Sequence, residues 1–150
     1  MFKLVDSGVQ LKLPRQLAKF LEGLPDLLES VGEQPGDPAA TRLQPMAYVD
    51  DVDAQSDYEE FAGPQLASMR ELDRQTFADS LADYRKGQIL TIQEAEAWVK
   101  VIGDARLALA ARAGINDSSW ETDTTGPVAP IIATLGYVQS SLVQALSAAL

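Results

Sequence analysis

The densest group of titratable side chains lies between residues 50 and 60, where six acids occur without one base. They are Asp50, Asp51, Asp53, Asp57, Glu59 and Glu60. Clustered carboxylates can hold a divalent cation, support an enzyme that uses carboxylates alone, or attract a basic surface. The spacing begins like a calcium loop, but Ser56 stands where the turn glycine belongs and Ala62 where the bidentate acid belongs. The match fails, which leaves loose divalent binding as the alternative to a solvated helix start.

Histidine and cysteine are both absent from the 150 residues. Their absence excludes thiol nucleophiles, disulfides, Cys/His zinc sites and thiolate redox sensing, and it removes the commonest general base. No catalytic, cofactor-binding or metal-binding residue is therefore predicted. A chain without cysteine suits a reducing compartment, so a cytoplasmic location is expected. The first ten residues include Lys3 and Asp6 and lack the apolar core of a signal peptide.

The charge of the chain bears on its class of partner. Twelve basic and 22 acidic residues give a formal net charge of −10. Phosphate contacts need clustered Lys and Arg, so free-standing binding to nucleic acid is disfavoured and direct DNA binding ranks third among the functions considered. A basic protein surface is the more natural partner for the acidic run. The same run could equally be a solubilising face, because runs of like charge commonly are.

A helix over residues 91–113 is predicted to organise the fold. Thr91 and Glu94 have the spacing of a capping box, in which each side chain pairs with a backbone N–H of the first turn. Gly114 supplies a left-handed stop. Apolar residues recur at helical spacing on one face of this helix, namely Ala95, Trp98, Val99, Ile102, Leu109 and Ala113.

The residues before position 32 predict a small β structure and a helix. Short strands at 2–5 and 9–13 form a β-hairpin, because they flank a turn that contains Gly8. Pro14 then opens a helix as its first residue, and Pro25 should kink or break that helix.

The next segment predicts two short helices and one longer helix. Asp37 and the proline after it start a short helix, and a second one spans 52–61. The pair Gly63–Pro64 separates this second helix from a helix over 64–84. Residues 89–90 are expected to add a short strand.

The predicted fold is mainly α, a single domain over residues 1–150 with a β-hairpin at 1–13 and a helical bundle at 14–150. Its core is expected to come from helices 64–84, 91–113 and 128–149. Residues 116–126 are rich in Ser, Thr, Asp and Gly around Trp120 and should form a loop.

Two charged residues fall within apolar helix faces. Arg106 projects into the face of the 91–113 helix described above, and Asp73 projects into a face of the preceding helix. That second face comprises Leu66, Met69, Phe77 and Tyr84. A charge that faces the core is costly unless it is paired. We therefore predict that the two helices pack together and that Asp73 and Arg106 form a structural ion pair rather than a catalytic dyad.

The final helix, 128–149, has an apolar stripe and an uncharged back. The stripe comprises Ile131, Leu135, Val138, Leu142 and Leu146; the back comprises Tyr137, Ser140, Ser141, Gln144 and Ser147. A helix exposed on one side normally carries charges there. Either the bundle covers this helix on both sides, or its back meets a second copy in a homodimer. Membrane insertion ranks third, because glutamine and serine are costly in lipid.

Three stretches carry a family resemblance: DPAATRLQPMAYVDD at 37–51, TIQEAEAWVKVIGDARLALAARAGI at 91–115 and LGYVQSSLVQAL at 135–146. Together they resemble an actinobacterial family of unknown function whose members include oxidative-stress transcriptional regulators (AosR-like). The resemblance covers most of the chain, and its motifs are packing and capping residues that name no active site. It implies a small cytoplasmic regulator that binds a sigma factor or another transcription component. A frequent gene neighbour, the Clp adaptor ClpS, implies a link to proteolysis.

The predicted function is therefore that of a non-enzymatic regulatory or protein-interaction protein, which offers residues 50–60 to a basic partner surface. That partner would be a transcription component or a protease-system subunit. Redox-responsive members of the family use a cysteine pair, which this chain lacks, so thiol sensing is not implied. The rival class is an enzyme that uses carboxylates, alone or with a divalent metal. A cleft with several convergent acids would favour the enzyme, and a closed bundle without a pocket would favour the interaction protein.

Overall fold

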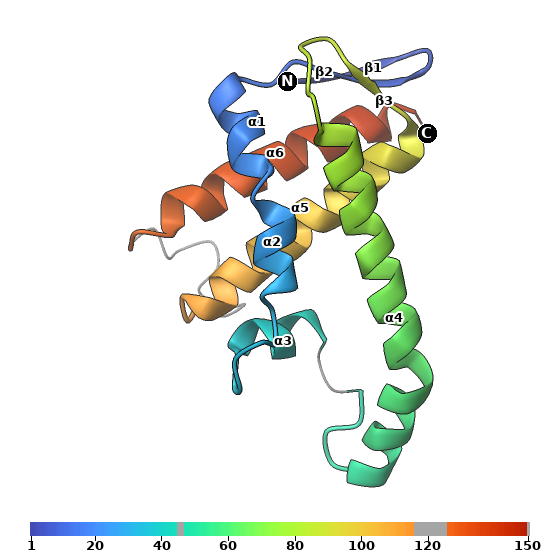
Figure 1. The fold of residues 1–150 in the computed structure, drawn as a ribbon, viewed down its shortest axis with the longest axis vertical. Coiled ribbons are helices and arrows are strands. Elements are labelled where there is room, and N and C mark those ends of the chain that lie inside the picture. Colours follow the sequence, from blue (N-terminus) through green and yellow to red (C-terminus); the bar gives the residue numbers. More distant parts are fainter. Residues whose placement is uncertain (45–46, 116–125, 150) are drawn as a thin grey trace.

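The computed structural model describes residues 1–44, 47–115 and 126–149, and the chain begins with a β-hairpin (Figure 1). β1 (Phe2–Val5) pairs antiparallel with β2 (Gly8–Leu11), and β3 (Ile89–Leu90) pairs antiparallel with the other edge of β2. A Cβ on Gly8 would lie 1.9 Å from the carbonyl oxygen of Leu90, so the close approach of the hairpin turn to β3 requires glycine. The predicted hairpin and the strand at 89–90 are both confirmed.

Two short helices follow the hairpin. α1 (Arg15–Leu21) starts after Pro14, and α2 (Leu24–Glu29) holds Pro25 in its first turn. The ring of a proline clashes with the carbonyl four residues earlier, which here belongs to Leu21. The predicted break therefore occurs one turn before Pro25 itself.

α3 (Pro38–Leu43) is the predicted short helix, and Asp37 caps it. Asp37 Oδ1 accepts the N–H of Ala39 at 3.0 Å, and Oδ2 accepts the N–H of Gly32 at 3.1 Å. The same carboxylate forms an ion pair at 2.8 Å with Arg112, in the last turn of α5 (Ile92–Arg112). A single side chain thus joins the loop before α3, the start of α3 and the end of α5.

α4 (Val52–Leu81) is a continuous helix of 30 residues, so the predicted break at Gly63–Pro64 is wrong. Pro64 lies inside the helix and is exposed. The carbonyl that it leaves without a donor belongs to Glu60, which is also exposed, so water can take the place of the missing hydrogen bond. The helix ends before the predicted boundary near 84, because Ala82 leaves the helical region with ψ of 136° and Asp83 then adopts a left-handed backbone with φ of 54°.

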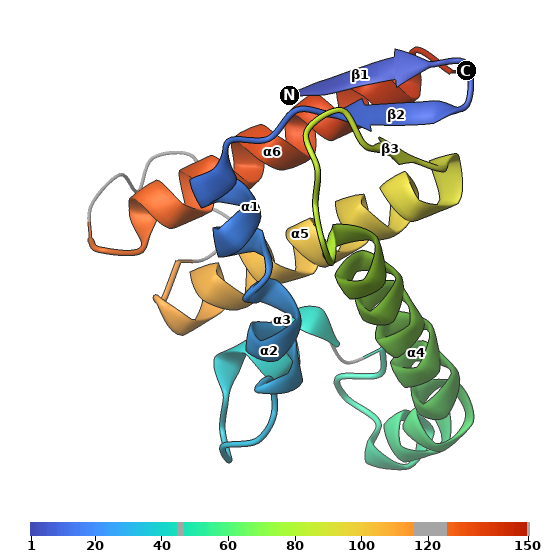
Figure 2. The ribbon, with the colours of Figure 1, turned by 45° about the horizontal axis from the view of Figure 1, so that its top comes forward.

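α5 lies at the centre of the molecule (Figure 2). Its predicted capping box is present, since Thr91 Oγ1 accepts the N–H of Glu94 at 3.1 Å and Glu94 Oε1 accepts the N–H of Thr91 at 2.8 Å. The helix packs against α2, α3, α4 and α6 (Ala129–Ser147). It is therefore buried on several sides, whereas the sequence predicted a single buried face. Its buried residues are Ala95, Ala97, Trp98, Val101, Ile102, Ala105, Ala108, Ala110 and Ala111.

Trp98 joins α5 to α4 in the core. Among the described residues, it is the largest side chain that is fully buried. Its ring centroid lies 4.8 Å from that of Phe77. The indole N–H donates to Ser80 Oγ at 2.7 Å, and this hydroxyl donates in turn to the carbonyl of Thr76 at 2.7 Å. The one polar atom of the tryptophan is therefore satisfied within the core.

α6 lies across α5 on the side opposite α3 (Figures 1 and 2). Its buried residues are Ile132, Leu135, Val138 and Leu142. Ile131, which was predicted in this stripe, is 37% exposed. Among the described residues, α6 alone is long and apolar enough to span a membrane. A single helix of this kind is only weak evidence for a membrane span, because core helices of soluble proteins can be equally long and apolar. The predicted loop around Trp120 falls on residues 116–125, outside the described part of the chain.

Candidate functional site

All six acids of the predicted partner-binding run are exposed, and we call residues 50–60 the acidic segment. Asp50 and Asp51 precede α4, and the other four acids lie on its first turns. Asp51 also caps the helix, because its Oδ1 accepts the N–H of Ala54 at 3.0 Å. The acids at the helix start, Asp51 and Asp53, are further favoured by the helix dipole.

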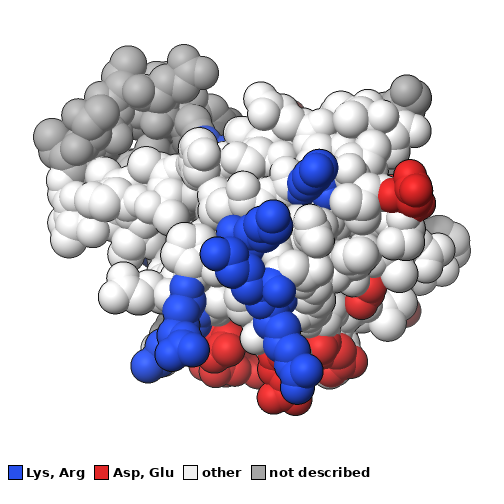
Figure 3. Space-filling view, turned by 90° about the horizontal axis from the view of Figure 1, so that it is seen from above, with Lys and Arg blue, Asp and Glu red and all other residues white. Residues whose placement is uncertain are grey.

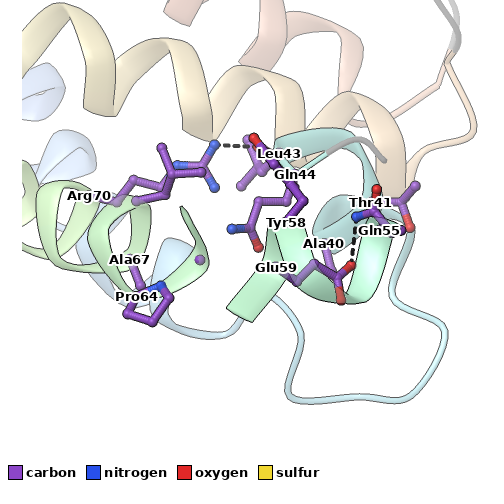
Figure 4. Close-up of a pocket in the computed structure, with 12 residues that line it drawn as sticks. Ala40, Thr41, Leu43, Gln44, Gln55, Tyr58, Glu59, Pro64, Ala67 and Arg70 are labelled. Carbon is purple, nitrogen blue, oxygen red and sulfur yellow. Dashed lines mark hydrogen bonds between the residues drawn. The ribbon is translucent and has the colours of Figure 1, made fainter. Parts of the chain in front are cut away.

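A buried glutamine ties the acidic segment to the chain before it. Gln55 is 6% exposed; its Oε1 accepts the N–H of Tyr48 at 2.8 Å, and its Nε2 donates to Glu59 Oε1 at 2.9 Å. The rings of Tyr48 and Tyr58 meet edge to face with centroids 6.2 Å apart. These contacts hold Glu59 on the side of α4 that faces α3 (Figure 4).

A groove of about 710 Å³ separates α4 from α3 (Figure 4). Arg70 of α4 donates to the carbonyl of Leu43 and links the two helices across it. Of the described residues that line the groove, Glu59 is the only acid. Across the described part of the chain, no group of three or more acids is placed to hold a metal ion. The bundle is therefore not closed, but its groove does not gather the convergent acids that a carboxylate enzyme needs.

α4 also carries large apolar side chains that are exposed to solvent. The exposed fraction is 81% for Phe61, 59% for Met69 and 67% for Leu72. Leu72 lies eleven positions after Phe61, about three turns further along the same side of a helix, and Met69 is a neighbour of Leu72, three positions before it. We call Phe61, Met69 and Leu72 the apolar stripe.

Sequence reasoning missed the apolar stripe because it assigned Met69 to a buried face with Leu66 and Phe77. In the structure Phe77 is buried, Leu66 is half-buried and Met69 is exposed. The signal available in the sequence was the distribution of apolar residues over two sides of the 52–81 segment, which is more than one core-facing stripe requires.

The structure corrects the predicted pairing of Asp73. Its Oδ2 lies 3.9 Å from Nζ of Lys100, so Asp73 is paired with Lys100 rather than with Arg106. The Arg106 guanidinium lies beside α6, where a Cβ on Gly136 would be 3.2 Å from it. The predicted packing of α4 on α5 is confirmed. The partner was wrong because α5 is buried on several sides, and the side with Arg106 turns to α6.

Asp104 is a further half-buried acid near this contact. It lines a second hollow, of about 310 Å³, together with Arg70 and Arg74. Burial raises the pKa of Asp104 above its ordinary value of 3.8, and the charge of Arg70 acts in the opposite direction. A carboxylate beside two guanidinium groups is typical of a structural charge pair. Proton transfer would instead need two acids placed close together.

The end of the molecule that bears the hairpin and α6 carries fewer charged side chains than the acidic segment (Figure 3). Figure 3 looks at this end and shows a broad uncharged area, with a band of Lys and Arg that runs from the middle to the lower edge and with Asp and Glu along the bottom and on the right. α6 contributes no charged residue to this area. The face of α6 that was predicted as its back is largely exposed, with Tyr137 66% exposed, so the described residues do not cover it.

Comparison with known proteins places the chain in a family. A family model described as a domain of unknown function (DUF2017) matches residues 4–146, so the chain belongs to this family. No curated protein and no solved structure shows significant similarity to the chain. The family match covers nearly the whole chain, and its description assigns no activity.

Proposed function

We propose that this protein is a non-enzymatic regulatory protein that binds a basic surface of another protein through the acidic segment. The observation that carries the proposal is the position of the six exposed acids. They lie at the end of α4 that extends away from α5 and α6 (Figure 1). A helix end that projects from a bundle is accessible to a large partner.

Charge selects the class of partner. Six acids within eleven residues attract a basic surface over a distance of about 10 Å and repel the phosphates of nucleic acid. Each exposed ion pair is worth only about 0–1 kcal/mol, so the acids raise the association rate and select the sign of the partner more than they set affinity. Tight binding through this segment therefore needs contacts of another kind as well.

The partner that we propose is a cytoplasmic transcription component, with a subunit of a protease system as the alternative. The support is the resemblance of residues 37–51, 91–115 and 135–146 to oxidative-stress regulators. A regulatory role of this chain in the stress response would rely on a signal other than its own thiol chemistry, since it has no cysteine.

The test compares three versions of the full chain as affinity baits in an extract of the native host. The first is the wild type. The second replaces the acids with their amides: Asp50→Asn, Asp51→Asn, Asp53→Asn, Asp57→Asn, Glu59→Gln and Glu60→Gln. The third makes the same change of charge at six exposed acids elsewhere: Asp6→Asn, Glu22→Gln, Glu29→Gln, Asp79→Asn, Asp83→Asn and Glu96→Gln. Asparagine at position 51 keeps a good helix cap, so the second bait should fold.

We expect mass spectrometry to identify a transcription component or protease subunit that the wild type and the third bait retain and the second bait loses. High salt should weaken its retention by the wild type. If all three baits retain the same proteins, or if none retains any, the acidic segment is not a partner site.

A further inference from the structure

We propose that the partner contributes a basic amphipathic α-helix, whose apolar side packs on the apolar stripe of α4. This inference rests on the proposed function and deepens it, because it assigns the conformation of the partner segment and the anchors that supply its affinity. Its starting point is the juxtaposition of exposed apolar and acidic rows along one helix.

The apolar stripe is exposed to solvent along α4. Single exposed apolar residues are common on protein surfaces and need no explanation. Phe61, Met69 and Leu72 are different, because each is more than half exposed, Phe61 and Leu72 lie on one side of a single helix, and Met69 adjoins Leu72. Several large apolar side chains exposed along one helix are typical of an interaction site.

The stripe is long enough to receive a partner helix. Phe61 and Leu72 are eleven residues apart, which corresponds to about 16 Å along a helix. A partner helix of about three turns, with apolar residues at i, i+3, i+4 and i+7, has the matching repeat. Gln65 and Ser68 lie between the anchors on the same side of α4 and carry no charge, so no charged group must be desolvated when the helices pack.

Acidic side chains lie beside the stripe. Asp53, Asp57 and Glu60 recur at i, i+4 and i+7, which places them in one exposed row along α4. This row lies next to the side that carries Phe61, four residues after Asp57. A helix with Lys or Arg flanking its apolar residues meets both rows at once. A second copy of this chain would instead bring like charges together, because each copy carries the same acids and a net charge of −10.

The test uses the full chain and a labelled synthetic peptide of leucine and lysine, about 18 residues long, whose leucines follow the helical repeat. A second peptide has the same composition with its leucines spread around the helix. Binding is measured by fluorescence anisotropy for the wild type, for Phe61→Ser/Leu72→Ser, and for Ile89→Ser/Val143→Ser as a matched control at exposed apolar residues elsewhere. All substituted side chains are exposed, so the variants should keep their fold.

We expect the first peptide to bind the wild type and the control variant alike, and to bind Phe61→Ser/Leu72→Ser at least about tenfold more weakly. The second peptide should bind the wild type more weakly than the first. Equal binding of both peptides, or no effect of Phe61→Ser/Leu72→Ser, would overturn the inference.

The variant with six neutralised acids separates this inference from the proposed function. If it loses the peptide while Phe61→Ser/Leu72→Ser binds as the wild type does, the acidic segment binds basic partners without the stripe, and only the inference fails. If sedimentation velocity shows a wild-type dimer that Phe61→Ser/Leu72→Ser dissociates, a second copy occupies the stripe and the inference fails as well.

Discussion

Trp98 and Asp37 are two of the single residues that link helices of this bundle. Trp98 joins α5 to α4 through the contact of its ring with the tilted ring of Phe77 and through its hydrogen bond to Ser80. Asp37 joins α3 to α5 through Arg112. The first contact is apolar and fully buried, and the second is a charged contact nearer the surface, so the two should respond differently to mutation and to pH.

Trp98→Ala should lower the free energy of unfolding by roughly 3–5 kcal/mol, because it removes a fully buried aromatic side chain and leaves a cavity. Trp98→Phe should cost less, since it keeps a ring against Phe77 and loses the hydrogen bond to Ser80 and only part of the buried side chain. Urea unfolding followed by circular dichroism measures both. An unchanged unfolding midpoint for Trp98→Ala would show that α5 does not organise the core.

The ion pair of Asp37 should make stability depend on acid pH. The hydrogen bond from Arg112 holds the pKa of Asp37 well below its ordinary value of 3.8. A carboxyl whose pKa is lower in the folded state stabilises the fold above its unfolded pKa, and that stability is lost as pH falls through the folded pKa. We expect the stability difference between the wild type and Asp37→Asn to be full near pH 7 and to shrink below about pH 4.

Asparagine can still cap α3 through Ala39 but loses the hydrogen bond from the Gly32 N–H, so the dependence of the stability difference on pH, rather than its size, reports the charge of Asp37. Arg112→Gln should show the same dependence on pH. A stability difference that stays constant from neutral to strongly acid pH would mean that the ion pair does not contribute.

At the scale of elements, the decisive feature is the continuity of α4. A helix that broke at Pro64 would separate the acidic segment from the core, whereas the continuous helix fixes its orientation relative to α5. The continuity also places Phe61 and Leu72 on one side of one helix. Both the proposed function and the inferred partner helix therefore depend on it.

Pro64→Ala tests this continuity. A proline inside a helix costs up to about 3 kcal/mol relative to alanine, so the substitution should stabilise the protein and increase its helical signal in circular dichroism. Pro38→Ala is the matched control, because Pro38 is the first residue of α3, where proline is favoured, and no gain is expected there. An absence of gain at Pro64 would indicate that two helices meet at this residue.

At the scale of the whole molecule, charge is divided between two regions. The acidic segment lies on the projecting end of α4, and α6 presents an uncharged face near the hairpin (Figures 1 and 3). At a net charge of −10, two copies repel each other least where charged side chains are absent. We therefore expect homodimers to form through the exposed face of α6.

Tyr137→Asp should lower the dimer fraction, because Tyr137 is the most exposed large apolar residue of α6 and an aspartate there places a charge on each copy at the contact. Sedimentation velocity over a range of concentrations measures the fraction, and Gln34→Asp, in an exposed loop away from α6, makes the same change of charge as a control. A wild type that stays monomeric at every concentration would remove this face as a dimer contact.

Local features of this protein could be predicted from its sequence. The capping box of Thr91 and Glu94, the start of α3 at Asp37, the hairpin turn at Gly8 and the exposure of the acidic segment were all predicted. Each of the first three depends on atoms within a few residues along the chain, and on backbone angles that one residue type tolerates better than others. The exposure of the acids follows from the cost of burying unpaired charge.

Only the tertiary structure decided which sides of the helices meet. The sequence of α5 has apolar residues on several sides, so it could not show that Arg106 turns to α6 and that Lys100 is the partner of Asp73. It also could not show that α4 runs through Pro64 and leaves the apolar stripe in solvent. A periodic pattern shows that a side chain prefers burial, but whether another helix covers it depends on contacts between residues far apart in the chain.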